Sequence, residues 1–307
     1  MQRIYLPEGR LLNGIKNRTA LSTVRKLEDA ATAGTVLEAF ALSCDSAHNL
    51  IVDLGVMKGI IPRCEGAIGI AEGTVRDIAL ISRVGKPVCF VIDGFTTDSS
   101  GQRIALLSRR KAQLAALNDY INHLTPGDIV SARVTHLESF GAFCDIGCGL
   151  VALMPIDTIS VSRISHPDDR FTVGEDIKAV IKSIIGNKIT LSMKELLGSW
   201  SENADCFAVG ETVSGIVRSV ESYGIFIELS PNLAGLAELK TNVAVGHKAS
   251  VYIKSILPDK MKVKLIIVDS FPDETAMLPI RYFISDGHID YWQYSPDCCC
   301  RNIGSQF

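Results

Sequence analysis

The stretch GDIVSARVTHLESFGAFCDIGCGLVAL, residues 127–153, is followed by a related stretch, GETVSGIVRSVESYGIFIELSPNLAGLAEL, residues 210–239. Both open on a glycine, alternate apolar and polar residues, and contain the spacing aromatic–Gly–x–Phe. Such alternation over short segments, interrupted by glycine, predicts β-strands. A more divergent third copy opens on Gly34. An internal repeat of this kind determines the architecture before any single motif does.

The remainder of each copy also repeats. A strand restarts at Gly85, Gly174 and Gly246, and a basic residue leads a last strand: RIALLS from Arg103, KITLSMK from Lys188 and KVKLII from Lys262. Five short strands in about 70–90 residues, with glycine at the turns, suit a small closed barrel. The sequence therefore predicts a mainly β protein with three tandem five-stranded barrels joined by short helices.

Helical spacing and turn signals divide the rest of the chain. Leu114, Leu117, Ile121 and Leu124 form an apolar stripe that predicts a helical linker, and Asp286-Gly287 between alternating apolar residues predicts a type I′ hairpin. The expected parts are a helical leader (1–33), a first barrel (34–108), a linker (109–126), a second barrel (127–194), a helical linker (195–208), a third barrel (209–269) and a C-terminal hairpin and tail (270–307).

Composition limits the class of protein. The chain has 307 residues, 47% of them hydrophobic, which is enough for packed cores. It lacks an apolar run of about 18 residues and an N-terminal signal core, so we expect a cytoplasmic protein without a membrane partner. Nine scattered cysteines fit a reducing compartment.

The charge balance is unusual for a nucleic-acid binder. The net charge is −3, residues 127–199 hold 7 basic and 9 acidic residues, and residues 209–269 hold 7 and 6. Because phosphate contacts usually dominate affinity, a basic balance is the common footprint of such proteins. Any RNA site must therefore be a local patch in which base stacking carries more of the affinity.

Two long segments carry a family resemblance. LSRRKAQLAALNDYINHLTPGDIVSARVTHLESFGAF (107–143) and SRISHPDDRFTVGEDI (162–177) resemble the bacterial ribosomal protein S1 family, and in particular its short homologues in anaerobic Gram-positive bacteria. The resemblance covers roughly residues 34–269. It implies OB-fold barrels, binding of single-stranded RNA (mRNA), and a role in translation as part of a ribonucleoprotein at the small ribosomal subunit.

The expected RNA-binding residues begin with the aromatic pairs. Single-stranded nucleic acid needs flat faces for its bases, and Phe140 and Phe143 in the second copy match Tyr223 and Phe226 in the third. The resemblance implies that these are stacking pairs. The alternative, that one ring of each pair belongs to the barrel core, is usual for strand aromatics, but the duplicated spacing argues against it.

Basic residues complete the expected site. Lys188 and Lys262 lead the last strands, and further cations near the two faces are Lys194, Lys254 and Lys264. The loop after the second copy's third strand offers Arg163, His166 and Arg170 near that copy's face, as RNA contacts or as solvated surface charges. The resemblance also implies a histidine on the third strand, where this chain has Ala152, Glu238 and Pro62.

The first copy departs from this pattern. Aligning Asp53 with Asp145 places His48 at the position of Phe140 and Ile51 at that of Phe143, while Arg103 keeps the basic position. Without stacking rings, this barrel is not expected to bind RNA as the others do. By analogy with the family's N-terminal domains, we expect residues 1–124 to dock on the small subunit.

The sequence gives little support for catalysis or for a bound cofactor or metal. No phosphate-binding loop, dinucleotide fingerprint, zinc-protease motif or nucleophile elbow is present, so we expect no enzyme activity, cofactor or small-molecule substrate. Cys298-Cys299-Cys300 lacks a second ligand pair, so we expect no metal. Two alternatives stay open: a ribosome-associated or RNA-regulatory factor that contacts structured RNA or proteins, and the RNA-binding subunit of an RNA-processing complex.

Overall fold

The structure is a computed structural model that describes residues 5–98, 100–186, 188–273 and 277–307. It divides into two compact units. Residues up to Leu124, together with Asp145–Val151, form the first, and Thr125–Cys144 with Ala152–Phe307 form the second.

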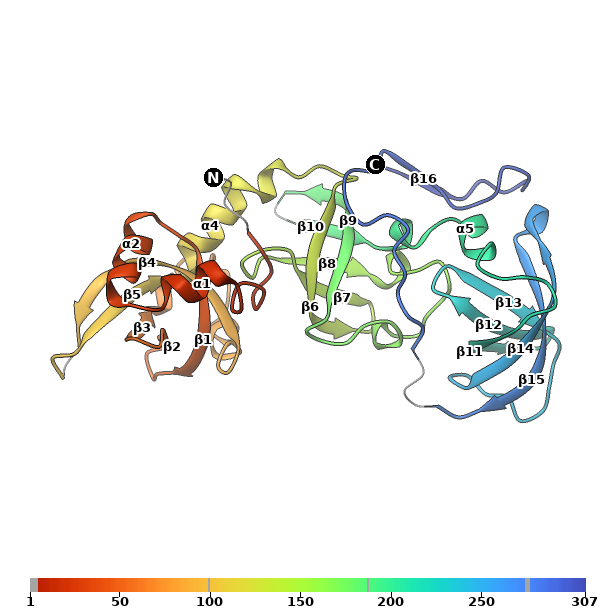
Figure 1. Ribbon diagram of the computed structural model, residues 1–307, viewed down its shortest axis with the longest axis horizontal. Coiled ribbons are helices and arrows are strands. Elements are labelled where there is room, and N and C mark those ends of the chain that lie inside the picture. Colours follow the sequence, from red (N-terminus) through yellow and green to blue (C-terminus); the bar gives the residue numbers. More distant parts are fainter. Residues whose placement is uncertain (1–4, 99, 187, 274–276) are drawn as a thin grey trace. The chain divides into compact units, whose positions relative to one another are not determined.

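The first barrel closes in the strand order β1-β2-β3-β5-β4 (Figure 1). Its core is filled by inward-facing residues such as Leu50, Phe90 and Leu107, all essentially without solvent contact. A short 3₁₀ helix, η1 (Arg63–Glu65), and a helical turn, α3 (Ile78–Ile81), lie between its third and fourth strands. The strands are β1 (Leu37–Cys44), β2 (Leu50–Asp53), β3 (Lys58–Ile61), β4 (Pro87–Thr97) and β5 (Arg103–Ser108).

The second and third copies form barrels of the same kind, which confirms the predicted fold class. The second barrel consists of β6 (Ile129–Glu138), β7 (Gly141–Asp145), β8 (Val151–Pro155), β9 (Asp176–Ile185) and β10 (Lys188–Ser192). The third consists of β11 (Thr212–Glu221), β12 (Gly224–Ser230), β13 (Leu233–Ala237), β14 (Lys248–Leu257) and β15 (Lys262–Phe271). Short 3₁₀ helices interrupt their loops: η3 (Ile156–Thr158), η4 (Pro167–Asp169) and η6 (Pro258–Lys260).

The glycines that punctuate the repeat have a backbone reason. Each has a φ between 58° and 96°, a region that residues with a Cβ rarely adopt. The chain therefore turns into the next strand at the same place in every copy. The six are Gly34, Gly85, Gly127, Gly174, Gly210 and Gly246.

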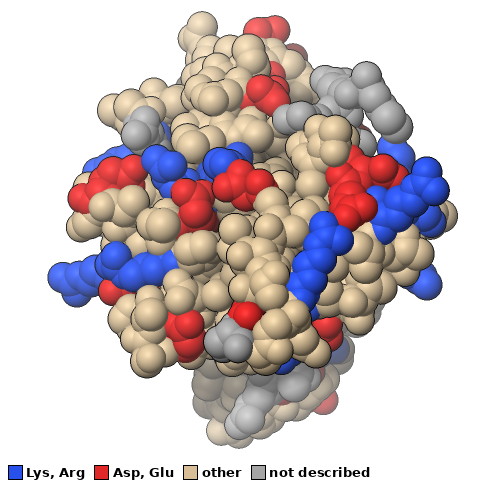
Figure 2. All heavy atoms as spheres, turned by 90° about the vertical axis from the view of Figure 1, so that its left-hand side faces the viewer, with Lys and Arg blue, Asp and Glu red and all other residues tan. Residues whose placement is uncertain are grey.

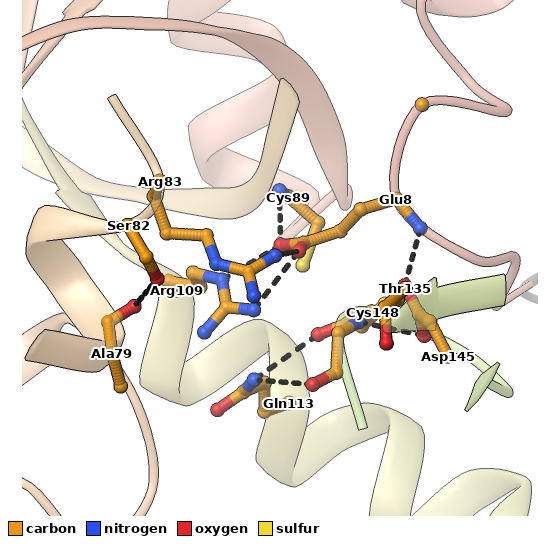
Figure 3. A network of polar contacts seen from close by, with 12 residues as sticks. Glu8, Ala79, Ser82, Arg83, Cys89, Arg109, Gln113, Thr135, Asp145 and Cys148 are labelled. Carbon is orange, nitrogen blue, oxygen red and sulfur yellow. Dashed lines mark hydrogen bonds and ion pairs between the residues drawn. The ribbon is translucent and has the colours of Figure 1, made fainter. Parts of the chain in front are cut away.

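The leader contains α1 (Ile15–Ala20) and α2 (Val24–Thr32), and Glu8 anchors the segment before α1 to the first unit (Figure 3). The Glu8 carboxylate accepts from Arg109 at 2.6 and 2.9 Å and from Arg83 at 3.1 Å. Burial alone would raise the pKa of Glu8, but the two guanidinium groups outweigh it and hold that pKa below its ordinary value. The Glu8 N–H donates to the Asp145 carboxylate at 2.7 Å.

The first linker is helical from Arg109 to Asp119 (α4) and continues in η2 (Ile121–His123). The expected stripe is shifted. Leu114 and Leu117 are only half-buried, whereas the buried face of α4 consists of Arg109, Ala112, Gln113 and Ala116. The small alanines let α4 approach β4 closely, so the helix is part of the first unit's packing.

The second linker contains η5 (Lys194–Leu197) and α5 (Trp200–Ala204), with Leu196, Leu197 and Trp200 buried as the sequence suggested. A C-terminal hairpin is present, formed by β16 (Tyr291–Gln293) and β17 (Gly304–Gln306). The prediction that the turn of this hairpin lies at Asp286-Gly287 is wrong. The flanking residues bond elsewhere: Phe283 N–H to the Leu196 carbonyl at 2.8 Å, and Ile289 N–H to that of Gly127 at 2.9 Å.

Candidate nucleic-acid interface

The second barrel presents Phe140 and Phe143 at the start of β7. Their ring centroids lie 6.0 Å apart and the ring planes are perpendicular. Phe140 is 54% exposed and Phe143 is half-buried, so neither belongs to the closed core. The arrangement leaves flat aromatic surface open to a ligand.

The third barrel repeats this arrangement at the start of β12. The centroids of Tyr223 and Phe226 are also 6.0 Å apart, at an angle of 87°, and Tyr223 is 69% exposed. Two copies of the repeat therefore build the same pair of perpendicular rings. The alternative that one ring of each pair fills the core does not hold for either barrel.

The glycine between the rings is required by the neighbouring strand. A Cβ at Gly141 would lie 2.4 Å from the carbonyl oxygen of Met154, and one at Gly224 would lie 2.7 Å from that of Ala237. Both obstacles are backbone atoms, which cannot move aside as a flexible side chain would. Glycine thus lets the strands pair closely at the point where the two rings emerge.

Strand register places cations on the third barrel's aromatic face. Ser219, Phe226, Leu236 and Lys264 are successive partners across β11, β12, β13 and β15, so their side chains share one outer row. Lys254 and Lys262 are also exposed on β14 and β15. All three predicted lysines of this copy are therefore available to a ligand.

The second barrel has fewer cations in the corresponding row. Thr190 pairs with Leu153 at the register that Lys264 and Leu236 occupy in the third barrel. Lys188 is exposed at the start of β10, whereas Lys194 is half-buried and donates to the Asp157 carbonyl at 3.4 Å. Ala152 is also the wrong residue for the position of the family histidine, because it faces inward and is 2% exposed. Leu153 and Leu236 are equivalent in register, so Pro155 corresponds to Glu238.

Two neighbours of this face were missed by the sequence reasoning. His136 stacks on Phe143 with ring centroids 6.3 Å apart, and its Nε2 lies 2.7 Å from the Glu138 carboxylate. Lys182 is exposed on β9. Lys182 could have been predicted from the sequence, because the tetrapeptide Ile-Lys-Ser-Ile occurs at both 181–184 and 253–256.

The loop between β8 and β9 places its three basic residues in different settings. Arg163 is exposed. His166 accepts the Asp168 N–H through its Nδ1 at the start of η4. Arg170 as an RNA contact is wrong: it is 1% exposed and forms an ion pair with Glu228 of the third barrel. Burial also lowers its pKa, although Glu228 partly offsets this effect.

Arg163 lies by the third barrel's rings. It lines a hollow of about 350 Å³ together with Tyr223 and Phe226. The sequence placed it near the second copy's face, because residue 163 lies within that copy. The ion pair of Arg170 with Glu228 instead fastens the loop to the third barrel. Barrels two and three therefore both contribute residues to this hollow.

The first barrel has the corresponding row but different chemistry. Ser43, Ile51, Ile60 and Leu106 are successive partners across β1, β2, β3 and β5. Leu106 thus occupies the register of Lys264, and Arg103 is displaced by one position from that of Lys262. Arg103 instead pairs with Glu28 at 2.8 Å and lies over the Phe95 ring. This face is apolar where the other two are aromatic and basic.

The surface shows no single-sign field on the face drawn in Figure 2, where lysine and arginine are interspersed with acidic side chains. Within the described residues, no group of three or more histidine, cysteine or acidic side chains could hold a metal ion. The helices of the same residues include none of the length and apolarity that a membrane span requires.

Comparison with known proteins agrees with this geometry. Residues 123–194 match the family described as the S1 RNA binding domain. Small ribosomal subunit protein bS1 of Staphylococcus aureus (strain COL) is 29% identical over 160 residues, 50% of this chain and 38% of that protein. The bS1 protein of Staphylococcus haemolyticus (strain JCSC1435) is 29% identical over 155 residues, 48% and 36%. The matches thus span under two fifths of these relatives.

Solved structures give weaker likenesses. A multidomain protein with nucleic acid binding domains from Streptococcus pneumoniae has a TM-score of 0.26 and 12% identity, covering 77% of this chain and 74% of that one. GSP13 from Bacillus subtilis has a TM-score of 0.22 and 20% identity, covering 23% and 56%. The domain match and the curated relatives are more informative. They show that residues 123–194 match the S1 RNA binding domain and that about half of this chain is similar to bS1 proteins.

Proposed function

We propose that this chain binds single-stranded RNA, with mRNA as its natural ligand, and acts in translation at the small ribosomal subunit without catalysing a reaction. The observation that carries the proposal is the matched pair of perpendicular, solvent-facing rings on two barrels. Stacking on aromatic rings accepts any base, which suits an mRNA ligand of variable sequence. The similarity to small ribosomal subunit protein bS1 supports the ribosomal setting.

The first barrel has a different part in this proposal. Its outer row carries Ile51, Ile60 and Leu106, where the third barrel has Phe226, Leu236 and Lys264. Such a face offers nothing for a phosphate and suits burial against a protein. We assign docking on the small subunit to residues 1–124. The nine free cysteines fit action in the reducing cytoplasm.

One alternative has an observation in its favour. The interspersed charges in Figure 2 suit contacts with structured RNA or proteins on a ribosome or in an RNA-regulatory complex. Membership of an RNA-processing complex is the other alternative. A single-stranded RNA and a hairpin of the same length separate the first alternative from our proposal, since stacking requires unpaired bases.

The decisive experiment removes both rings from one barrel. Replacing Phe140 and Phe143 by alanine should weaken binding of a single strand long enough to span both barrels by about 2–5 kcal/mol, because each stacked base contributes about 1–3 kcal/mol. The measurement is fluorescence anisotropy with a labelled oligonucleotide. The same is expected for Tyr223 and Phe226.

The matched control is Ile51→Ala, which truncates the corresponding position of the first barrel and should leave the Kd unchanged. Circular dichroism verifies that each variant is folded. An unchanged Kd in a folded variant that lacks both rings would contradict the proposal.

A further inference from the structure

The hollow beside Tyr223 and Phe226 has two walls from different barrels. One wall is the loop Ser162–Ser165, which follows the second barrel's third strand. The other is the third barrel's face, with the rings of Tyr223 and Phe226. The volume of about 350 Å³ is enough for one nucleobase with part of its ribose. Its remaining lining consists of Arg218, Ser219, Glu221 and Ala234.

A buried ionic network holds the two walls together. Glu228 accepts from Arg170 of the loop and, at 2.6 Å, from Arg218 of β11. Arg218 also donates to Asp169 at 2.7 Å. The Ser162 N–H donates to the Pro231 carbonyl at 3.1 Å. Because these bonds join protein groups to one another, they hold both walls in place, and a ligand does not have to assemble the hollow.

The network leaves one free charge of each sign in the hollow. The charges of Arg218, Arg170, Asp169 and Glu228 offset one another. Within the described part of the chain, Arg163 and Glu221 form neither an ion pair nor a side-chain hydrogen bond. A carboxylate that is exposed beside two stacking rings can accept hydrogen bonds from the edge of a stacked base.

The second barrel provides an internal comparison. Glu138 occupies the position of Glu221, since both precede Ser-aromatic-Gly in the repeat. The Glu138 carboxylate is engaged by His136, at 2.7 Å. The third barrel has Ser219 in place of His136, and Glu221 has no such partner among the residues that the structure describes. The two barrels thus share a stacking pair but differ in the freedom of this carboxylate.

We propose that the hollow is a base-reading subsite, in which Glu221 selects guanine and Arg163 binds the adjacent phosphate. The inference rests on the proposed binding of single-stranded RNA and adds a sequence preference to it. A carboxylate has two acceptor oxygens, and the edge of guanine carries two adjacent donors, N1–H and N2–H. Uracil has one N–H between two carbonyls, and adenine has one amino group beside an acceptor nitrogen.

The test compares three fluorescein-labelled RNA dodecamers: alternating U and G, alternating U and A, and U alone. The full chain should bind the U/G strand about tenfold more tightly than the U/A strand, as expected for one paired contact to a base edge. The U/A strand controls for the stronger stacking of purines. Glu221→Gln should reduce the preference to about twofold or less, because an amide offers one acceptor and places a donor against the base.

Two further variants make the result specific. Glu138→Gln alters the corresponding carboxylate of the second barrel and should preserve the preference for the U/G strand. Arg163→Gln should weaken all three strands by a similar factor, since a phosphate contact does not depend on the base. Circular dichroism verifies that each variant is folded.

Three outcomes would overturn the inference. They are no U/G preference in the unmodified chain, an unchanged preference in Glu221→Gln, and an equal loss in Glu138→Gln. If all three strands bind but without preference, the base-reading subsite is wrong and the proposed RNA binding stands. If the unmodified chain binds none of them, the proposed function fails as well.

Discussion

Arg170 and Glu228 illustrate how a charge can serve structure at the edge of a binding face. Both side chains are excluded from solvent, and Arg218 shares the Glu228 carboxylate. Taking such charges out of water is costly, and their mutual attraction compensates only while each keeps its partner. The network therefore depends on every member, and loss of Glu228 would leave two guanidinium groups facing each other.

This argument gives a prediction for Glu228→Gln. The substitution keeps the size of the side chain and removes its charge, so the free energy of unfolding should fall by about 3–5 kcal/mol. Urea denaturation measures the change. The control is Asp176→Asn, which neutralises the partly exposed pair with Arg133 and should cost at most about 1 kcal/mol. Equal losses in the two variants would show that the buried network has no special role.

Single residues also show where sequence reasoning succeeds. The partly exposed ring pairs follow from local spacing, because two copies of the repeat preserve aromatic–Gly–x–Phe, whereas their stacking on bases stays a prediction. The burial of Arg170 depends on a partner 58 positions away, and nothing near Arg170 in the sequence indicates it. Lys182 is an intermediate case. It could have been predicted as the equivalent of Lys254, because Ile-Lys-Ser-Ile occurs in both copies.

The C-terminal segment shows that long-range contacts can also decide the path of a whole element. Alternating residues around Asp286-Gly287 are typical of a hairpin, but their backbone groups bond to other segments. Asp128 and His288 form an isolated bridge, and Tyr294 donates to the Asn232 carbonyl at 2.7 Å. The barrels could be predicted because they close within each copy. The path of this segment could not, because barrels two and three must first provide the surface that it covers.

His288 gives a pH-dependent test of that path. A hydrogen bond to Asp128, at 2.7 Å, raises the pKa of His288 above its ordinary 6.5, and the charges of Asp128 and Asp290 contribute further. A raised pKa means that this contact stabilises the fold fully below pH 6.5 and is lost as the pH rises through the folded value. In an NMR titration, Asp128→Asn should therefore lower the pKa of His288.

The comparison variant is Asp290→Asn. Asp290 lies farther from the ring, at 3.3 Å, and is almost fully exposed, so its removal should change the pKa less. A His288 pKa that is unaffected by Asp128→Asn would mean that the segment does not lie beside Asp128 in solution.

At the scale of the whole molecule, the net charge of −3 implies that RNA binding is only weakly salt-dependent. The exposed cations near the two ring pairs are few: Arg163, Lys182, Lys188, Lys254, Lys262 and Lys264. If about two to four phosphates are neutralised, the slope of log affinity against log salt should be about −1.5 to −3 on single strands. Anisotropy titrations at several salt concentrations measure it, and a slope steeper than about −6 would require a basic surface elsewhere.

The division of labour between barrels gives the last prediction. Ile60 and Leu106 are neighbours in the first barrel's outer row, at the positions of Leu236 and Lys264 in the third. If this apolar row docks on the small ribosomal subunit, a charge placed in it must be desolvated on binding, which is costly. Leu106→Lys introduces the residue that the third barrel has at this register. Co-sedimentation with small subunits should weaken about tenfold or more, whereas the Kd for a free single strand should stay within about twofold. The control, Lys264→Leu, makes the reciprocal exchange and should weaken RNA binding without affecting co-sedimentation in the absence of mRNA. If Leu106→Lys leaves subunit binding unchanged, the row is not the docking surface, and the first barrel must use another face.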